Sequence, residues 1–223
     1  DPEQATEKSK DLVRMAVARA LKLESIKQLQ SPVMQKGLVI GGGLSGMTAA
    51  LSLARQGFEV CLVEKDEKLG GFLNRLHYTL TGDDVREQLK RLLDDVQAEE
   101  RIKVFTSAEV IEFSGHVGNF HATIKTKNKK EKVDVGAIIV ATGASEYKPT
   151  EYLYGQNPNV LTQLELEEKI ASAPDSVKDA RKIVMIQCVG SRDEEHQYCS
   201  RVCCGQGVKN ALKLKELNPA ADI

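Results

Sequence analysis

Three observations predict an α/β fold with a mainly parallel sheet. An apolar strand at residues 37–40 leads into a glycine-rich turn, an Ala- and Leu-rich helix and a second apolar strand. That second strand contains Val60-Cys61-Leu62-Val63, a continuous apolar run typical of parallel strands that are buried on both faces. A later stretch, residues 108–135, alternates or is rich in β-forming residues, as antiparallel strands are. The sequence therefore predicts a βαβ-type parallel sheet with an antiparallel insertion.

The first thirty residues are predicted to form one amphipathic helix. Apolar side chains such as Leu12, Leu23 and Ile26 recur at helical spacing, and Ser31-Pro32 ends the pattern. We expect this helix to pack on its own domain; docking to another subunit is the alternative. Residues 1–32 are therefore interpreted as a helix and a linker.

The first domain is predicted at residues 33–145. Its parallel strands are expected at residues 37–40, 58–64, 102–106 and 136–140. A helix ends at about Gln56, with Gly57 as its cap, and another begins after Asp84, with Glu87 three residues on. A three-stranded antiparallel meander at about residues 108–136 is inserted before the last strand.

Residues 146–180 are interpreted as a connector, with a short helix capped by Thr162 and Glu165. A truncated second domain is expected at residues 181–223. It should begin with a strand at 182–186, continue through a cysteine-rich loop, and end with a helix at about 205–217. We expect the chain to be a fragment of a longer protein.

Composition argues against two classes of partner. The chain has 31 Lys plus Arg and 32 Asp plus Glu, and no dense basic stripe, so nucleic-acid binding is not expected. Its apolar runs fall far short of the roughly 20 residues that a membrane helix needs. Four of the five cysteines lie within residues 188–204, which favours metal or redox chemistry and a cytoplasmic location.

A dinucleotide site is predicted at the first glycine turn. The pattern Gly41-x-Gly43-x-x-Gly46 follows an apolar strand and opens a helix, and Glu64 lies at the tip of the next strand. The glycines permit a tight turn, close approach of a pyrophosphate and close helix–strand packing, while the helix N-terminus offers free N–H groups. A glycine-rich turn without a ligand is the alternative.

The segment Leu69-Gly70-Gly71, the meander and the closing Ala141-Thr142-Gly143 together resemble flavoproteins of the glutathione and thioredoxin reductase class. That resemblance implies a Rossmann-type FAD-binding domain and the start of a second dinucleotide-binding-like domain. It implies that the FAD contacts are Gly41, Gly43, Leu44, Ser45, Gly46, Glu64, Gly70, Gly71, Val110, Ala141, Thr142 and Gly143. Lys65 is either a further contact or a solvated surface lysine. The second domain lacks a glycine fingerprint, so a nicotinamide site is not expected, and the late Gly-Asp pair of these flavoproteins is missing.

Four thiols on one loop match the ligand count of a [4Fe–4S] cluster or of an all-cysteine zinc site, although the usual spacings of neither are present. Residues 186–193, 198–204 and 208–213 resemble the flavoprotein of heterodisulfide reductase, its A subunit, and the similarity extends along essentially the whole chain. It implies that Cys188, Cys199, Cys203 and Cys204 ligate one [4Fe–4S] cluster. It further implies that Lys209 is catalytic, a cation near the flavin ring; an exposed helix lysine is the alternative.

These features predict an electron-transfer flavoprotein module in which FAD exchanges electrons with a [4Fe–4S] cluster. The family implies other redox subunits as partners, and a homodimer is a further possibility. Two alternatives remain open. One is an FAD-dependent thiol–disulfide oxidoreductase using Cys203 with Cys204 or Cys199; the other is a zinc-stabilised, non-catalytic scaffold.

Overall fold

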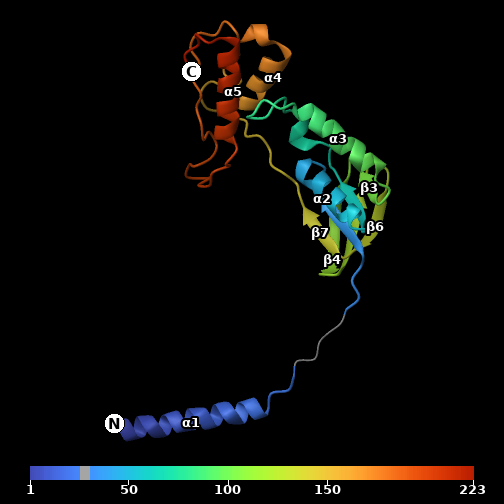
Figure 1. Ribbon diagram of the computed structural model, residues 1–223, viewed down its shortest axis with the longest axis vertical. Coiled ribbons are helices and arrows are strands. Elements are labelled where there is room, and N and C mark those ends of the chain that lie inside the picture. The colour runs from blue at the N-terminus through green and yellow to red at the C-terminus, as the bar shows by residue number, and fades with distance from the viewer. Residues whose placement is uncertain (26–30) are drawn as a thin grey trace. The chain divides into compact units, whose positions relative to one another are not determined.

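The computed structural model describes residues 1–25 and 31–223, in two compact units, residues 1–32 and 33–223 (Figure 1). The first unit contains α1 (Pro2–Leu21), which Asp1 caps by accepting a hydrogen bond from the Glu3 N–H. The helix is shorter than predicted, because the Lys22 N–H turns back to the carbonyls of Arg19 and Ala20. Ile26 lies outside the described residues. That α1 packs on its own domain stays a prediction.

The second unit is built around a four-stranded parallel sheet of order β3-β2-β1-β7. Its strands are β1 (Lys36–Ile40), β2 (Glu59–Val63), β3 (Ile102–Phe105) and β7 (Ala137–Val140). Helices α2 (Leu44–Arg55) and α3 (Val85–Ala98) cover one face. The α2 helix ends where predicted, with Gly57 at a positive φ of 96° just beyond its end.

An antiparallel meander covers the other face of the parallel sheet. Its strands β4 (Glu109–His116), β5 (Asn119–Lys125) and β6 (Lys130–Val135) pair in chain order. The two covered faces explain the continuous apolar run in β2: Val60 and Leu62 pack into the helix layer, and Cys61 and Val63 pack into the meander layer. The predicted α/β fold, with its parallel sheet and three-stranded meander, is confirmed.

The rest of the second unit carries η1 (Gly71–Asn74), α4 (Gln163–Ser172), η2 (Pro174–Ser176) and α5 (Cys203–Leu217). The predicted capping box at the start of α4 is present, because Thr162 and Glu165 exchange hydrogen bonds. Helices α4 and α5 pack side by side (Figure 1). Since α5 begins two residues earlier than expected, Cys203 and Cys204 lie in its first turn.

The predicted strand at residues 182–186 is wrong. The segment makes one isolated parallel bridge, between Lys182 and Asp222, and Val184 is 84% exposed. A strand needs a neighbour along its length, and the described residues supply one only at this single position. The apolar composition of the segment was therefore not sufficient to make it a strand.

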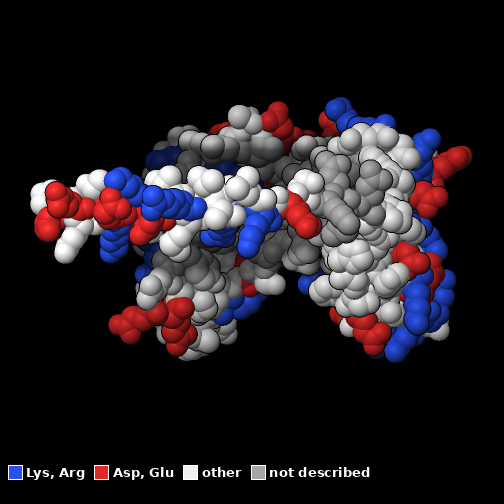
Figure 2. Space-filling model, turned by 90° about the horizontal axis from the view of Figure 1, so that it is seen from below, with Lys and Arg blue, Asp and Glu red and all other residues white. Residues whose placement is uncertain are grey.

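On the face that Figure 2 shows, basic and acidic side chains are interspersed, in keeping with the balanced composition. Among residues 1–25 and 31–223, no helix combines the length and the apolar character needed to cross a membrane.

Candidate functional site

The glycine turn joins β1 to α2 by close backbone contacts. Gly41 has a φ of 110°, and a Cβ there would lie 2.2 Å from the carbonyl oxygen of Ala141. A Cβ on Gly46 would lie 1.7 Å from the carbonyl oxygen of Gly41. Neither position accepts a side chain in this structure, so these two glycines let the helix begin directly against the strand ends.

Gly43 differs from its neighbours because a Cβ there would meet nothing within 4 Å. It is the N-cap of α2, and no side chain caps this helix. The first N–H groups of an α-helix have no partner within the helix, and they carry the positive end of its dipole. Gly43 therefore leaves open space at an uncapped helix N-terminus, where Leu44 and Ser45 are exposed.

Glu64 follows β2 and is 5% exposed. Its carboxylate accepts hydrogen bonds from the backbone N–H groups of Gly42, at 2.6 Å, and Asp66, at 2.9 Å. These bonds hold the carboxylate beside the glycine turn. Sequence reasoning gave Gly42 no separate role, but its N–H orients Glu64, and a Cβ added at this position would lie 2.4 Å from Leu69. The three consecutive glycines at residues 41–43 are the sequence feature that could have indicated this role.

Two further predicted segments lie against the same turn. The Gly70 N–H donates to the Gly42 carbonyl at 2.8 Å, and a Cβ on Gly71 would lie 3.2 Å from the Gly43 Cα. The Ala141 N–H donates to the Ile40 carbonyl at 2.8 Å, so Ala141, Thr142 and Gly143 pass on the other side. The structure thus brings three separate predicted segments together around the N-terminus of α2.

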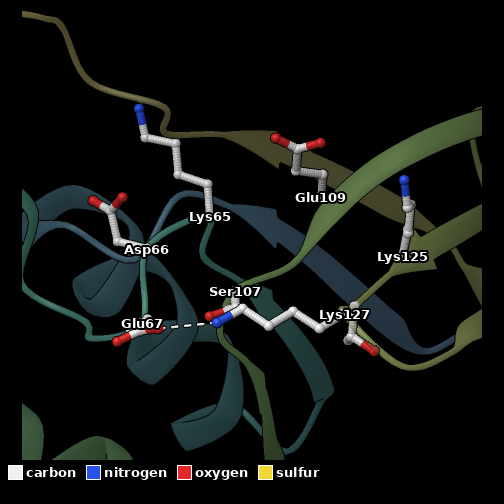
Figure 3. Close-up of a pocket in the computed structure, with 8 residues that line it drawn as sticks. Lys65, Asp66, Glu67, Ser107, Glu109, Lys125 and Lys127 are labelled. Carbon is white, nitrogen blue, oxygen red and sulfur yellow. Dashed lines mark hydrogen bonds and ion pairs between the residues drawn. The ribbon is translucent and has the colours of Figure 1, made fainter.

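A cavity of about 400 Å³ lies at the carboxyl end of β2, between the loop after Glu64 and the meander (Figure 3). Lys65 lines it, together with Asp66, Glu67, Ser107, Glu109, Lys125, Thr126 and Lys127. One ion pair, Lys127 to Glu67 at 3.0 Å, crosses its edge. Val110 is half-buried beside Glu109, at a β-bulge of β4, and is not among the lining residues.

These features fit a dinucleotide. A pyrophosphate needs N–H donors and a backbone without side chains, which Gly43 and the start of α2 offer. The ribose hydroxyls need an acceptor, which Glu64 offers. The cavity in Figure 3, of about 400 Å³, adjoins the loop that follows Glu64. A dinucleotide such as FAD therefore fits the residues present.

The four clustered cysteines are all free thiols. The backbone N–H of Arg201 donates to the Cys199 sulfur at 3.4 Å, and the Ser200 hydroxyl donates to the Cys203 sulfur at 3.6 Å. Cys188 and Arg201 have φ values of 61°, a conformation that non-glycine residues rarely adopt. The loop is thus held in a strained backbone conformation, as loops at functional sites often are.

The thiols influence one another electrostatically. The hydrogen bond from Ser200, together with further bonds from Cys188 and Cys204, lowers the pKa of Cys203 despite its partial burial. Charge on Cys203 raises the pKa of Cys204, and Cys188 and Cys199 add to that effect. The four sulfurs therefore lie within electrostatic range of one another, and Cys203 forms a thiolate more readily than the neighbouring Cys204.

The donor set fits a [4Fe–4S] cluster in chemistry, because four thiolates are its ligand complement. Within residues 1–25 and 31–223, however, no three His, Cys, Asp or Glu side chains are already arranged around a common metal position. The loop from residue 188 to residue 204 has to close for four sulfurs to bind one cluster.

Lys209 is not an exposed helix lysine. It is 7% exposed, pairs with the fully buried Glu167 at 2.8 Å, and donates to the Tyr78 carbonyl at 2.7 Å. Three hydrogen-bond donors, the His77 N–H, Lys209 and Gln206, keep the pKa of Glu167 below its usual value, although burial alone would raise it. A role of Lys209 at a flavin stays a prediction.

A parallel sheet with an uncapped, glycine-lined helix N-terminus and a carboxylate after the second strand is the arrangement typical of dinucleotide-binding domains. The chain belongs to the pyridine nucleotide-disulphide oxidoreductase family, which it matches over residues 35–186. It is accordingly a chain of an oxidoreductase family.

The resemblance to the A subunit of heterodisulfide reductase is confirmed along the whole chain. The chain is 34% identical to a protein of Methanopyrus kandleri that is named as the second iron-sulfur A subunit of CoB–CoM heterodisulfide reductase. It is 33% identical to the A subunit of the H2:CoB–CoM heterodisulfide,ferredoxin reductase of Methanothermobacter thermautotrophicus. Both alignments include 100% of this chain and 48% of the relative, so the chain spans about half the length of these relatives. The Methanopyrus alignment runs over 316 residues against 223 here, so that relative carries additional segments within the aligned region.

The chain is also similar to the solved structure of L-proline dehydrogenase from P. horikoshii. That similarity covers 67% of this chain and 30% of the other, with a TM-score of 0.49 and 21% sequence identity.

Proposed function

We propose that this chain is an FAD-binding electron-transfer module of a protein like the A subunit of heterodisulfide reductase. The single observation that carries the proposal is the open N-terminus of α2 at Gly43, which lies beside Glu64 and between the two flanking glycine segments. The family match and the named relatives support the redox character.

In this proposal the chain binds and orients the cofactor. Gly43, Leu44 and Ser45 offer N–H groups to the pyrophosphate, and Glu64 accepts from the ribose. When bound, FAD supplies one- and two-electron redox chemistry. Gly41 and Gly46 keep the turn close to the sheet and so fix where the phosphates lie.

The second part of the proposal assigns Cys188, Cys199, Cys203 and Cys204 to one [4Fe–4S] cluster. It is supported by the number of thiols, by their electrostatic proximity and by the words "iron-sulfur" in the name of the Methanopyrus relative. The same proposal includes other redox subunits as partners, a homodimer and a cytoplasmic location. The relatives are named as subunits, which supports partner subunits.

One observation favours a second candidate, an FAD-dependent thiol–disulfide oxidoreductase. Cys203 is the first residue of α5, whose N-terminus no side chain caps, and Ser200 donates to its sulfur. A thiol at a helix N-terminus is stabilised as the thiolate, which is the nucleophile of disulfide exchange. In this candidate Cys204 or Cys199 would be the partner thiol.

Anaerobic reconstitution of the 223-residue chain with FAD, iron and sulfide tests both candidates. Bound flavin, iron, acid-labile sulfide and zinc are then measured in the wild type, in Cys188→Ser, and in Cys61→Ala as a control that also removes one cysteine. We expect the wild type to bind stoichiometric FAD together with about four irons and four sulfides. The iron and the sulfide should be lost in Cys188→Ser and kept in Cys61→Ala.

Other outcomes separate the parts of the proposal. Stoichiometric FAD without iron contradicts the cluster and favours the dithiol candidate, which does not need Cys188. Zinc in place of iron, with no redox-active flavin, favours a structural scaffold. No bound FAD contradicts the flavoprotein assignment itself.

A further inference from the structure

Residues 75–78, which we call the linking segment, directly follow the short helix that begins at the glycine pair of the dinucleotide site. Gly71 is the first residue of η1, and the helix ends with a hydrogen bond from the Arg75 N–H to the Phe72 carbonyl at 2.9 Å. Leu73 is buried in the core beneath α2 and α3. The linking segment is therefore attached to Gly71 by one compact, anchored turn.

The linking segment is also bonded to α4. The fully buried Glu167 accepts from the backbone N–H groups of His77, at 2.7 Å, and Tyr78, at 3.4 Å. At the start of the segment, Arg75 pairs with Glu146 at 2.8 Å. Glu146 lies in the chain after Gly143, so this pair joins the two loops that flank the glycine turn.

The same segment is bonded to α5, the helix that begins with Cys203 and Cys204. The Tyr78 carbonyl accepts from Lys209, and the Tyr78 hydroxyl donates to the fully buried Asn210 at 2.9 Å. The Asn210 amide in turn donates to the Gln163 carbonyl at 2.8 Å. Each of these polar atoms is partnered, and among the described residues no buried side-chain nitrogen or oxygen lacks a hydrogen bond.

A fully satisfied buried polar network permits few alternative arrangements, because shifting one member leaves others unpaired and desolvated. Movement of the linking segment therefore requires movement of α4 and α5 with it. A ligand seated at Gly43 lies close to Gly71, since a Cβ added to Gly71 would be only 3.2 Å from the Gly43 Cα. The contacts run without a break from Gly43, through η1 and the linking segment, to the cysteine-bearing helix.

We propose that the linking segment couples occupancy of the dinucleotide site to the order of α5, with Glu167 and Asn210 as positioning residues. This inference rests on the proposed function, since it takes FAD as the ligand of the glycine turn. By restraining Gly71 and η1, the bound dinucleotide reduces opening of the network and so of the first turns of α5. Because such coupling is reciprocal, disorder in α5 also weakens dinucleotide binding.

Hydrogen exchange with mass spectrometry, run on the 223-residue chain with and without FAD, tests the coupling. We expect FAD to slow amide exchange in peptides covering α5 by about fivefold or more. In Glu167→Gln that protection should fall to less than about half. The matched control is Glu216→Gln, which neutralises an exposed carboxylate on α5 and should retain the protection.

A second variant keeps the test decisive if Glu167→Gln does not fold. Tyr78→Phe keeps the aromatic ring and removes only the hydroxyl that donates to Asn210, so it should fold and lose part of the protection. FAD affinity is measured in parallel by flavin fluorescence. The coupling is overturned if the wild type binds FAD but amide exchange in α5 does not change. It is also overturned if FAD protects α5 equally in Tyr78→Phe and Glu216→Gln. Either result leaves the proposed function standing. Absence of FAD binding overturns both.

Discussion

Replacement of Gly43 by alanine tests the placement of the pyrophosphate. A Cβ at Gly43 meets no protein atom within 4 Å, and its φ of −78° suits any residue. The folded chain should therefore accept Gly43→Ala with a change in unfolding free energy of less than about 1 kcal/mol. If the pyrophosphate binds as proposed, the new methyl group occupies the space that the phosphates need.

The expected loss of affinity follows from the contacts displaced. Hydrogen bonds to a charged group contribute about 1.5–3 kcal/mol each, and the methyl group displaces at least one of them. A loss of about 2 kcal/mol corresponds to about 30-fold weaker FAD binding. The assay is titration of FAD by flavin fluorescence, with thermal unfolding of the ligand-free protein as the measure of folding.

Two further glycine variants serve as controls. Gly205→Ala also adds a methyl group in open space, on α5 and away from the glycine turn, and should not weaken FAD binding. Gly46→Ala drives a methyl group against the Gly41 carbonyl, and should cost about 3 kcal/mol of stability before any ligand is added. A folded Gly43→Ala protein that binds FAD as tightly as the wild type would refute the reasoning.

Three further outcomes are expected. Thr162→Ala removes the capping box of α4 and should lower the unfolding free energy by about 1 kcal/mol in urea denaturation; an unchanged midpoint would contradict a stabilising role of the cap. Burial alone would raise the pKa of Glu165, but hydrogen bonds, chiefly from the Tyr154 hydroxyl, outweigh it and lower the pKa to about 2. Because this pKa is lowered on folding, the carboxylate stabilises the protein above its ordinary pKa of 4.5, and the effect is lost as the pH falls towards 2. The Glu165 side chain is 34% exposed, so solvent screening keeps the effect small. The difference in unfolding free energy between the wild type and Glu165→Gln should be about 1 kcal/mol at pH 6 and near zero at pH 2. A difference that does not depend on pH would contradict this reasoning. Lys209→Met leaves Glu167 buried without its cation and should cost about 3–5 kcal/mol, whereas a cost below about 1 kcal/mol would show that water reaches the carboxylate.

Several features of the fold could be predicted because their signals are local. The continuous apolar run of β2 reflects a strand covered on both faces, and the glycine spacing reflects a helix that must begin against the sheet. The segment at residues 182–186 has similar apolar character but no strand neighbour along its length. Composition cannot show whether a pairing partner is present, so that prediction failed.

The buried network around Glu167 could not be predicted in this way. Glu167 lies three residues from both Leu164 and Ile170, on the apolar face of α4, and this charge at an apolar position could have indicated a buried ion pair. The partners could not be inferred, since Glu167 bonds His77, 90 residues away in the sequence, and Tyr78 bonds Asn210, 132 residues away.

The sequence by itself determined the parallel sheet, the meander and the glycine turn, because periodicity and glycine spacing act over a few neighbouring residues. Only the tertiary structure shows that Lys209 is buried in an ion pair, that the Gly42 N–H orients Glu64 and that Cys203 is the first residue of α5. The reason is physical: burial and electrostatic partnership depend on which distant segments pack together, and packing is a property of the whole folded chain.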